Sequence, residues 1–432
     1  MKKTFFIETL GCKVNQYESE AIREKLISQG CEEAKYGNVP DIAIFNTCCV
    51  THLAERKSRQ AIRKYARMVP KPTIAVLGCY SQIAPEEIEK IKGVNLVMGA
   101  CGKGSLASRL RRIDNERMLV FNDPIAIHDT YEDMGLNDHE GKTRAFIKIQ
   151  DGCDNFCSYC IIPYTRGRTR SRPFESIRKE ASLLAERGYS EVVLIGIQSA
   201  FYGIDLEEEI ELVDVVESLA EIDGINRIRL GSCEPTYFTE ARLRRLSNIK
   251  KFCPHFHLSL QSGSDSVLKA MSRKYSTAQY SKIMNDIRDI FENPAVTTDL
   301  IVGFPGETDE SFEETLVFIK NMAFKDIHVF RYSKRKGTAA AEMPNQVNPS
   351  IAKSRSTAAI ERAGECAKYF AQSQTGRVEQ VLFESICKEG VWEGHCMNFM
   401  KVRVESEESL SGHMRQVRLN SVDGDVIWGE IV

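Results

Sequence analysis

Long hydrophobic runs and a strong net charge are both missing from this chain of 432 residues. No apolar stretch reaches the roughly 18 residues that a membrane-spanning helix needs. Glu8 interrupts the short apolar stretch behind Lys2 and Lys3, which argues against a signal peptide. The formal net charge of −2 excludes an overall basic field, so any nucleic-acid surface must come from local clusters. We expect a cytoplasmic protein with no membrane partner.

Disulfide bonds are a further expected absence, although the chain has 14 cysteines. Thiols stay unpaired in a reducing compartment, so metal binding or catalysis is the better explanation for so many of them. A free cysteine also serves as a small buried hydrophobic residue. The positions of the cysteines relative to the predicted strands decide between these roles.

The first 100 residues alternate strands and helices. Continuous apolar strands between helices predict an open parallel sheet that is covered on both faces. We expect its strands at 3–9, 41–46, 73–77 and 95–98 and its helices at 18–28, 52–67 and 85–91. Cys12, Cys48 and Cys79 each come just after one of the first three strands. The carboxyl ends of parallel strands meet at one edge, so these cysteines should converge in space.

Three further units follow a connecting segment at 101–143. Alternating strands and helices predict a partial (βα)6 barrel over 144–348, with its chemistry at the carboxyl-end loops. A linker helix is expected at 349–373, and short alternating strands predict a small antiparallel β-barrel at 374–432. The fold class is therefore α/β with a closing all-β unit. The barrel strands are expected at 145–150, 191–198, 227–232, 255–261, 296–304 and 327–333.

A cysteine triplet directly follows the first of these barrel strands. Cys153, Cys157 and Cys160 lie within eight residues, and thiolates are the usual ligands of iron–sulfur clusters. Three cysteines leave one iron of a 4Fe–4S cluster open to chelate S-adenosylmethionine, whose reductive cleavage releases a 5′-deoxyadenosyl radical. The alternative is a structural zinc site, but zinc needs four closed ligands and no fourth cysteine or histidine is adjacent.

The CxxxCxxC spacing, with an aromatic residue before the last cysteine, resembles that of the radical S-adenosylmethionine superfamily. Further motifs resemble the methylthiotransferases within it, and the final β segment lies where that family carries a TRAM domain. The first of these motifs most resembles the members that act on N6-threonylcarbamoyladenosine. The motifs are TLGCKVNQYES at 9–19, NTCCVT at 46–51, GCY at 78–80, PHFHLSLQSGSD at 254–265 and DLIVGFPGET at 299–308.

The resemblance implies that Cys12, Cys48 and Cys79 hold a second, auxiliary 4Fe–4S cluster, which carries or receives the sulfur to be inserted. Cys49 is a neighbour of Cys48, and the family pattern N-T-C-x-V-T assigns the ligand to Cys48. The alternative is that the three are ordinary core cysteines. The resemblance also implies a sulfur donor and an external electron donor such as flavodoxin or ferredoxin.

Contacts to S-adenosylmethionine are expected around the triplet. The superfamily usually places an aromatic residue near the adenine at the position of Tyr159, and loop packing is the alternative. Polar residues at the barrel strand ends are candidates for holding the ribose and methionine parts, or else form structural hydrogen bonds. They are Gln198, Ser232, Glu234, Gln261 and Asp299. The run at 195–203 departs from the family pattern, with Gln198 where asparagine is usual.

Two arginine clusters are the expected contacts to RNA phosphates. A merely solvated basic face is the alternative for each of them. From Thr375 onward, six basic against ten acidic residues give a net charge of −4, which is unusual for an RNA-binding barrel. The first cluster, over 53–67 of the expected helix, supplies Arg56, Arg59 and Arg63, and the second, over 166–172, supplies Arg166, Arg168 and Arg170.

The resemblance implies the addition of a methylthio group to carbon 2 of N6-threonylcarbamoyladenosine at position 37 of tRNA. One S-adenosylmethionine would methylate the sulfur and a second would give the radical. An anticodon stem-loop suits this chemistry, because its unpaired bases can be splayed into a pocket. The alternatives are methylthiolation of isopentenyladenosine in tRNA or of a ribosomal protein, and a metal-containing RNA-binding protein without activity.

Overall fold

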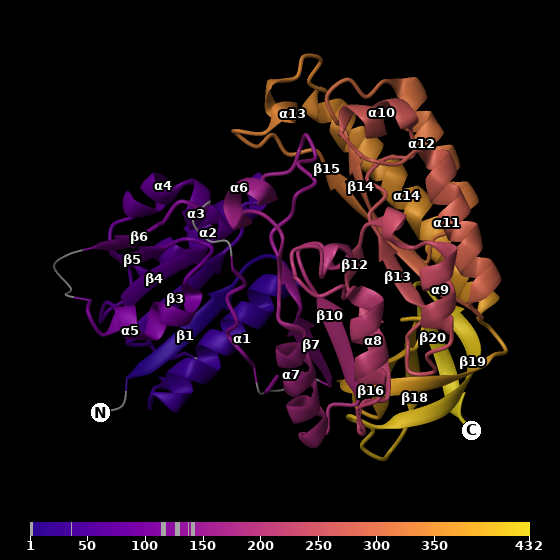
Figure 1. Cartoon of the computed structure of the whole chain (residues 1–432), viewed down its shortest axis with the longest axis horizontal. Helices are drawn as coiled ribbons and strands as arrows, with labels where there is room; N and C mark the ends of the chain where they lie inside the picture. The colour runs from indigo at the N-terminus through magenta and orange to yellow at the C-terminus, as the bar shows by residue number, and fades with distance from the viewer. Residues whose placement is uncertain (1–2, 36, 114–117, 126–129, 137, 140–142) are drawn as a thin grey trace.

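The computed structural model describes residues 3–35, 37–113, 118–125, 130–136, 138–139 and 143–432. Figure 1 shows an N-terminal sheet domain on the left, a central unit of strands wrapped by helices, and a small β-barrel at the lower right. The two termini lie at opposite ends of the molecule. Within the described ranges, no helix has both the length and the hydrophobicity to span a membrane.

The N-terminal domain is a six-stranded parallel sheet in the order β2-β1-β3-β4-β5-β6. The middle strand β3 is buried along its whole length, as expected for a parallel sheet with helices on both faces. The strands are β1 Thr4–Thr9, β2 Glu32–Glu33, β3 Ile42–Thr47, β4 Thr73–Gly78, β5 Val94–Met98 and β6 Leu119–Phe121. The helices are α1 Lys13–Ser28, α2 His52–Tyr65, α3 Cys79–Ile83, α4 Pro85–Glu89, η1 Lys103–Ser105 and α5 Leu106–Leu110.

This domain extends beyond the boundary expected at residue 100. Helix α5 and strand β6 lie inside the predicted connecting segment, and β6 pairs with β5. A strand of three residues is too short to show a recognisable alternation in the sequence. Helix α1 also begins earlier than predicted, because Val14, Tyr17 and Ala21 form a buried face that the polar residues between them obscure.

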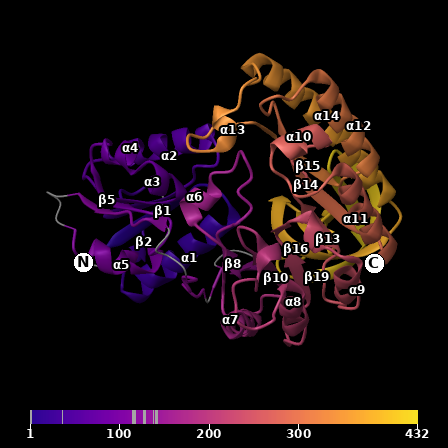
Figure 2. The same ribbon diagram turned by 45° about the horizontal axis from the view of Figure 1, so that its top comes forward.

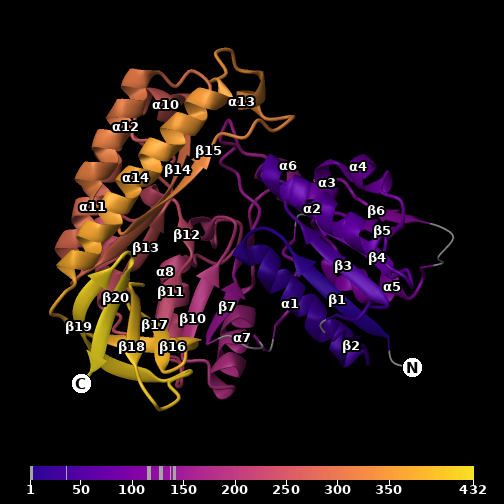
Figure 3. The same ribbon diagram turned by 180° about the vertical axis from the view of Figure 1, so that it is seen from behind.

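The central unit is a partial barrel of parallel strands. The strands β7, β10 and β11 form one sheet and β12 to β15 another, and a bridge pairs Ile228 of β11 with Phe252, just before β13. Figure 3 shows helices along the outer side. The barrel strands are β7 Arg144–Lys148, β10 Glu191–Ile195, β11 Arg227–Leu230, β12 Ser232–Cys233, β13 His255–Leu258, β14 Ala295–Val302 and β15 Asp326–Arg331.

The connections of the partial barrel are mainly helical. Apolar residues of the strands, such as Ile147 and Leu194, and of the outer helices, such as Ile177 and Val216, form the largest core of the molecule. The helices are α6 Ile162–Arg166, α7 Phe174–Glu186, η3 Ser199–Phe201, α8 Leu212–Ala220, η4 Pro235–Tyr237, α9 Glu240–Ser247, α10 Asp265–Ala270, α11 Thr277–Ile290, α12 Asp309–Met322 and α13 Ala339–Glu342. A short ribbon, β8 Gln150–Asp151 with β9 Arg170–Ser171, flanks the triplet loop.

Helix α14 (Pro349–Ser373) contacts β15 and leads into the closing barrel (Figure 3). The closing unit is a closed five-stranded barrel in the order β16-β17-β18-β20-β19. Four of its strand pairs are antiparallel, as predicted, and the pair of β18 with β20 is parallel. Five strands cannot alternate in direction all the way around a ring. The strands are β16 Val378–Lys388, β17 Val391–Cys396, β18 Lys401–Glu405, β19 Met414–Asp423 and β20 Val426–Ile431.

Candidate functional site

The three cysteines of the N-terminal domain converge at one edge of its sheet. Cys12 follows β1, Cys48 follows β3 and Cys79 follows β4, and these strands are neighbours. The thiols of Cys12 and Cys48 lie within electrostatic range of Cys79. Cys48 and Cys79 are buried, whereas Cys12 lines a cavity. The order of the parallel strands thus brings the three thiols together.

Two glycines allow the loops that carry these thiols to approach one another. Gly11 has φ +114° and Gly78 has φ +107°, conformations that glycine adopts without steric cost. A Cβ atom at Gly11 would lie 2.8 Å from the Cβ of Cys48, and one at Gly78 would lie 2.5 Å from the carbonyl oxygen of Thr47. The backbone before Cys12 and before Cys79 therefore requires a glycine if the three thiols are to come together.

Two buried asparagines tie the same loops together. The Asn15 amide donates to the carbonyl oxygens of Leu10 and Thr47, at 2.8 and 3.2 Å. The Asn46 amide donates to the carbonyl oxygen of Asn15 at 2.9 Å and to Ser19 Oγ at 3.0 Å. Each asparagine thereby satisfies buried backbone or hydroxyl groups that would otherwise lack a partner. These contacts account for Asn15 in the first motif and Asn46 in the second.

Arg166 lies at the centre of a buried ion network beside these thiols. Its Nε donates to Cys79 Sγ at 3.3 Å, and its guanidinium pairs with Glu18 at 2.8 Å and Asp151 at 3.0 Å. Lys148 pairs with the same two carboxylates, at 2.8 and 2.7 Å. Glu18 belongs to the N-terminal domain and Lys148 to the barrel. The network therefore joins the two units, and Figure 2 shows α6, which carries Arg166, between them.

Two of the arginines that were expected to contact RNA lie in the interior instead. Arg166 is 1% exposed and Arg170 is 3% exposed, and Arg170 donates to the carbonyl oxygen of Arg166 at 2.7 Å. Both guanidiniums compensate buried carboxylates, a need that the sequence does not reveal. Arg168, between them, has an 85% exposed side chain. The basic residues of helix α2 lie wholly or partly at the surface: Arg56, Arg59 and Arg63.

The pKa values of the thiols at this edge of the sheet differ from one another. Burial raises the pKa of Cys48 to about 12. A hydrogen bond from Cys49, supported by the charge of Arg166, lowers the pKa of Cys79, and the same bond raises the pKa of Cys49. Cys49 lies in the apolar core of the sheet domain. The Cys49 thiol therefore donates its hydrogen bond to Cys79 from within the apolar core.

The triplet lies on the loop between β8 and α6. The Cys153 N–H donates to the carbonyl oxygen of Gly167 at 3.0 Å, and the Cys160 N–H donates to that of Cys157 at 2.9 Å. The Arg273 guanidinium donates to Cys157 Sγ at 3.3 Å. Burial raises the pKa of Cys153 to about 11 and that of Cys160 to about 12. Backbone hydrogen bonds within the loop and to Gly167 and Met271 thus hold it, with a cation beside one thiol.

Arg273 was not among the predicted site residues, yet it organises several that were. Its guanidinium lies 2.8 and 2.9 Å from the two carboxylate oxygens of Glu234. The Glu234 N–H donates to the side-chain oxygen of Gln198 at 3.0 Å, and Asn155 in the triplet loop donates to Glu234 at 3.4 Å. Glu234 and Gln198 thus lie beside the triplet. Arg273 carries no local sequence signal, because only the fold places it next to Cys157.

The other predicted cofactor contacts differ in how accessible they are to a ligand. Tyr159 packs against an apolar cluster that includes Met271, which is the loop packing considered as its alternative role. Gln261 is 9% exposed, and its N–H donates to the carbonyl oxygen of Asp299 at 2.9 Å. Ser232 and Asp299 line the cavity that Cys12 also lines. Those two are therefore accessible to a ligand in this structure.

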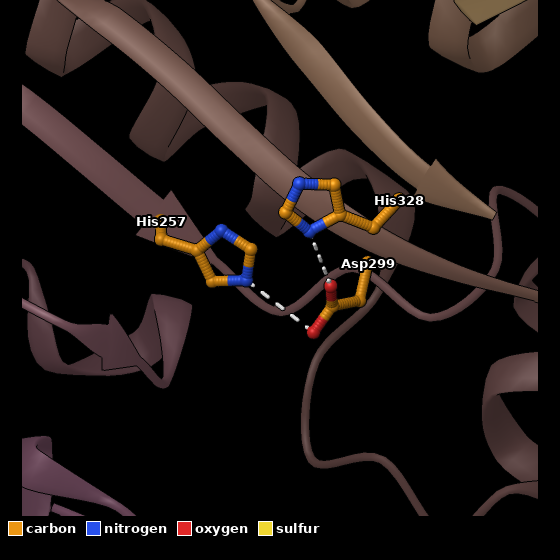
Figure 4. A group of neighbouring side chains, drawn as sticks. All are labelled: His257, Asp299 and His328. Atoms are coloured by element: carbon orange, nitrogen blue, oxygen red, sulfur yellow. Dashed lines mark ion pairs between the residues drawn. The ribbon is translucent and has the colours of Figure 1, made fainter. Parts of the chain in front are cut away.

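This cavity has a volume of about 590 Å³, within the usual range for small-molecule sites. All three units contribute to its lining, with Cys12 from the N-terminal domain, Ser232 from the barrel and Phe399 from the closing unit. Asp299 lies between two histidines in Figure 4, with ring nitrogens of His257 and His328 each 3.3 Å from a carboxylate oxygen. The cavity is large enough for a modified nucleoside.

The histidines fix the charge of this carboxylate. Although burial opposes ionisation, hydrogen bonds from His257 and His328 hold the pKa of Asp299 well below its usual range. Hydrogen bonds to Asp299 and Asp326 raise the pKa of His328 to about 9. Sequence reasoning identified Asp299 but missed both histidines, although His257 lies inside one of the quoted motifs.

The spacing of the thiols indicates which metal group they suit. Among the described residues, the one set of three ligating atoms that lie within 4.8 Å of one another is His257, Asp299 and His328. Neither cysteine set is that compact, whereas sulfur ligands around a single zinc lie about 3.8 Å apart. Thiolates that bind different irons of one cluster are spread more widely. Both cysteine sets therefore fit an iron–sulfur cluster better than one zinc ion.

Models of two known protein families match the N-terminal domain and the partial barrel separately. The model of the Radical SAM superfamily matches residues 147–319, and that of the Uncharacterized protein family UPF0004 matches residues 4–99. The threonylcarbamoyladenosine tRNA methylthiotransferase MtaB of Bacillus subtilis (strain 168) is 37% identical over 421 residues, 96% of this chain and 93% of that protein. This chain belongs to the radical SAM methylthiotransferase family. As a member it is an enzyme that uses S-adenosylmethionine, a 4Fe–4S cluster and an auxiliary cluster.

Methylthiotransferases that are named for a different substrate are similarly related to the chain. The tRNA-2-methylthio-N(6)-dimethylallyladenosine synthase of Clostridium tetani (strain Massachusetts / E88) is 37% identical over 396 residues, 90% of this chain and 86% of that protein. Solved structures share the fold. The radical S-adenosylmethionine methyltransferase TsrM from Kitasatospora setae superposes with a TM-score of 0.58 at 13% identity, over 79% of this chain and 77% of that one.

Proposed function

We propose that this methylthiotransferase adds a methylthio group to carbon 2 of N6-threonylcarbamoyladenosine at position 37 of tRNA. The observation that carries the proposal is the cavity of nucleoside size between Cys12 and the barrel strands. Relatives that cover nearly the whole chain support the reaction class and, in the case of the Bacillus subtilis protein, the substrate. A dimethylallyladenosine substrate is the second candidate, because one relative that is named for it has the same 37% identity to this chain.

Each cysteine set has a separate role in this proposal. Cys153, Cys157 and Cys160 hold the cluster that binds S-adenosylmethionine, and Cys12, Cys48 and Cys79 hold the auxiliary cluster. When bound, these groups supply the 5′-deoxyadenosyl radical and the sulfur. The chain's own contribution is to hold the thiols, to place an arginine beside each set (Arg273 and Arg166), and to enclose the nucleoside away from water. Such positioning by preorganised charges is a general requirement of radical enzymes.

The partners are proposed from the surface and the chemistry. Helix α2 and Arg168 present exposed cations that suit the phosphates of an anticodon stem-loop. The reaction requires an external electron donor, such as flavodoxin or ferredoxin, and a sulfur donor, and it would take place in the cytoplasm. We assign the closing barrel over 374–432 as a TRAM-like unit that adjoins the partial barrel of 144–348.

Nucleoside mass spectrometry of tRNA tests this proposal. Cells that lack the gene would be compared with cells that express the wild-type chain or, as a matched control, the Cys153→Ala variant. We expect 2-methylthio-N6-threonylcarbamoyladenosine with the wild-type chain alone. Appearance of the methylthio form of the dimethylallyl nucleoside instead would replace the substrate, and unchanged tRNA would move a protein target to the front.

A further inference from the structure

The cavity between Cys12 and the barrel has a predominantly basic lining. Four lysine and arginine side chains line it against only two carboxylates, those of Asp299 and Asp326. The four cations are Lys13, Arg144, Arg229 and Lys325. An excess of positive charge in a concave, protein-enclosed space attracts an anion.

Most of these charges are already paired within the protein. The two arginines pair with glutamates at 2.9 and 2.8 Å, and the two carboxylates pair with His257 and His328. Lys13 and Lys325 differ, because neither has a carboxylate within 4.0 Å in the part of the chain that the structure describes. Burial lowers the pKa of Lys325, although the more distant carboxylates of Asp326 and Asp425 oppose this shift. These two lysines are the cations available to a ligand.

His255 adds a hydrogen-bonding group to the lining of the same cavity. Its ring is 6% exposed, and its Nδ1 has no hydrogen-bond partner among the described residues. Its Nε2 lies 3.2 Å from Thr297 Oγ1, and the ring stacks on Phe399. Burial and neighbouring cations, including Lys325 and Lys13, lower the pKa of His255. A neutral ring that lines a cavity with an unpartnered nitrogen indicates a bound polar group.

We propose that Lys13, His255 and Lys325 form an anion subsite for the threonyl carboxylate of N6-threonylcarbamoyladenosine, an assignment that rests on the proposed function. The carboxylate would neutralise both lysines and accept a hydrogen bond from His255, and charge-assisted hydrogen bonds are the strong ones. A dimethylallyl group is apolar and would leave both cations unpaired beside it. The subsite therefore favours threonylcarbamoyladenosine over dimethylallyladenosine. Sequence identity to the relatives does not distinguish these two substrates.

The test compares binding of anticodon stem-loops that differ only in this carboxylate. The reconstituted full-length chain would be titrated with RNA that carries threonylcarbamoyladenosine, its methyl ester or dimethylallyladenosine, with fluorescence anisotropy as the readout. We expect wild-type protein to bind the free acid about 10-fold to 100-fold more tightly than the ester, as for a hydrogen-bonded charge. Lys325→Met and Lys13→Met should bring this ratio close to one, and Lys325→Arg should restore it. Lys353→Met, an exposed lysine on α14, is the matched control and should keep the wild-type ratio.

Two results would overturn the subsite. One is equal binding of acid and ester by the wild-type chain, which needs no variant and does not depend on how the variants fold. The other is an intact acid-to-ester ratio in Lys325→Met with a weakened affinity for S-adenosylmethionine, which would assign the cations to that cofactor. In either case, methylthiolation of the threonylcarbamoyl RNA would show that the proposed function survives. Product from the dimethylallyl RNA alone would refute that function itself.

Discussion

Arg273 donates to Cys157 and Arg166 donates to Cys79, each at 3.3 Å, yet the two thiol sets are assembled in different ways. The triplet lies on one loop, which backbone hydrogen bonds hold internally and also tie to Gly167 and Met271. The N-terminal set needs three neighbouring strands and the packing of two units around Arg166. The ligands of one set are therefore local in sequence, whereas the sheet brings together those of the other, although both sets have a buried guanidinium beside a thiol.

The difference indicates how each site should respond to substitutions. Arg273 is anchored mainly by the carboxylate of Glu234. Arg166 shares its two carboxylates with Lys148, and one of these carboxylates comes from the N-terminal domain. Substitutions in the triplet should affect the chemistry alone. Substitutions around Arg166 should also weaken the contact between the N-terminal domain and the barrel.

Removal of single ligands should distinguish the roles of the two cysteine sets. We expect Cys153→Ala to abolish cleavage of S-adenosylmethionine and methylthiolation together. Cys12→Ala should abolish methylthiolation while cleavage continues. Each variant should lose about four of eight irons per chain after anaerobic reconstitution, since each set would hold one 4Fe–4S cluster. Iron analysis and 5′-deoxyadenosine assays check this, and loss of cleavage in Cys12→Ala would contradict the separation.

The adjacent cysteines Cys48 and Cys49 offer a matched pair within the N-terminal set. We expect Cys48→Ser to lose the auxiliary cluster, because its thiol lies beside Cys12 and Cys79. Cys49→Ser should keep the cluster but lower the free energy of unfolding by about 1–3 kcal/mol, because it buries a hydroxyl in an apolar core. Iron content and chemical denaturation measure the two effects. A cluster lost in Cys49→Ser alone would reverse the assignment.

Arg166 should matter more for stability than its exposed neighbour Arg168. Arg166→Met leaves Glu18 and Asp151 without their main cation, and breaking a buried ion pair costs about 3–5 kcal/mol. Arg168→Met removes a side chain that is 85% exposed and should leave the free energy of unfolding unchanged. Denaturation of the two variants under the same conditions measures the difference. Equal stabilities would show that the ion network does not hold the two units together.

The smallest expected effect concerns the pH dependence of stability around His328. Its pKa is raised to about 9 by Asp299 and Asp326, so the ion pairs stabilise the fold below the ordinary histidine pKa. This stabilisation disappears as the pH rises through about 9. The ring is half exposed, which limits the effect to about 1 kcal/mol or less. The difference in Tm between wild type and His328→Gln should therefore shrink between pH 7 and pH 10, roughly across that titration. His413→Gln serves as the exposed control, and a difference independent of pH would contradict the pairing.

Local patterns were sufficient for much of the architecture. Apolar runs between helical segments predicted the parallel strands of both α/β units, and helix α14 spans Pro349–Ser373 against an expected 349–373. The boundary at residue 100 was less accurate, because β6 has three residues and its place in the sheet depends on β5. A strand that short acquires its identity from its partner and not from its own periodicity.

For the site, the sequence by itself determined which residue types carry the chemistry. The spacing of Cys153, Cys157 and Cys160 is local, and the motif resemblance supplied the family, which the comparisons confirm. Only the tertiary structure decided which charges lie beside the thiols. It placed Arg166 in the interior rather than on an RNA-binding surface, brought Arg273 to Cys157, and gathered Lys13, His255 and Lys325 around one cavity. The reason is physical, because a cysteine spacing is encoded in consecutive residues, whereas the pairing of a buried charge depends on whichever distant side chain the fold places within hydrogen-bonding distance.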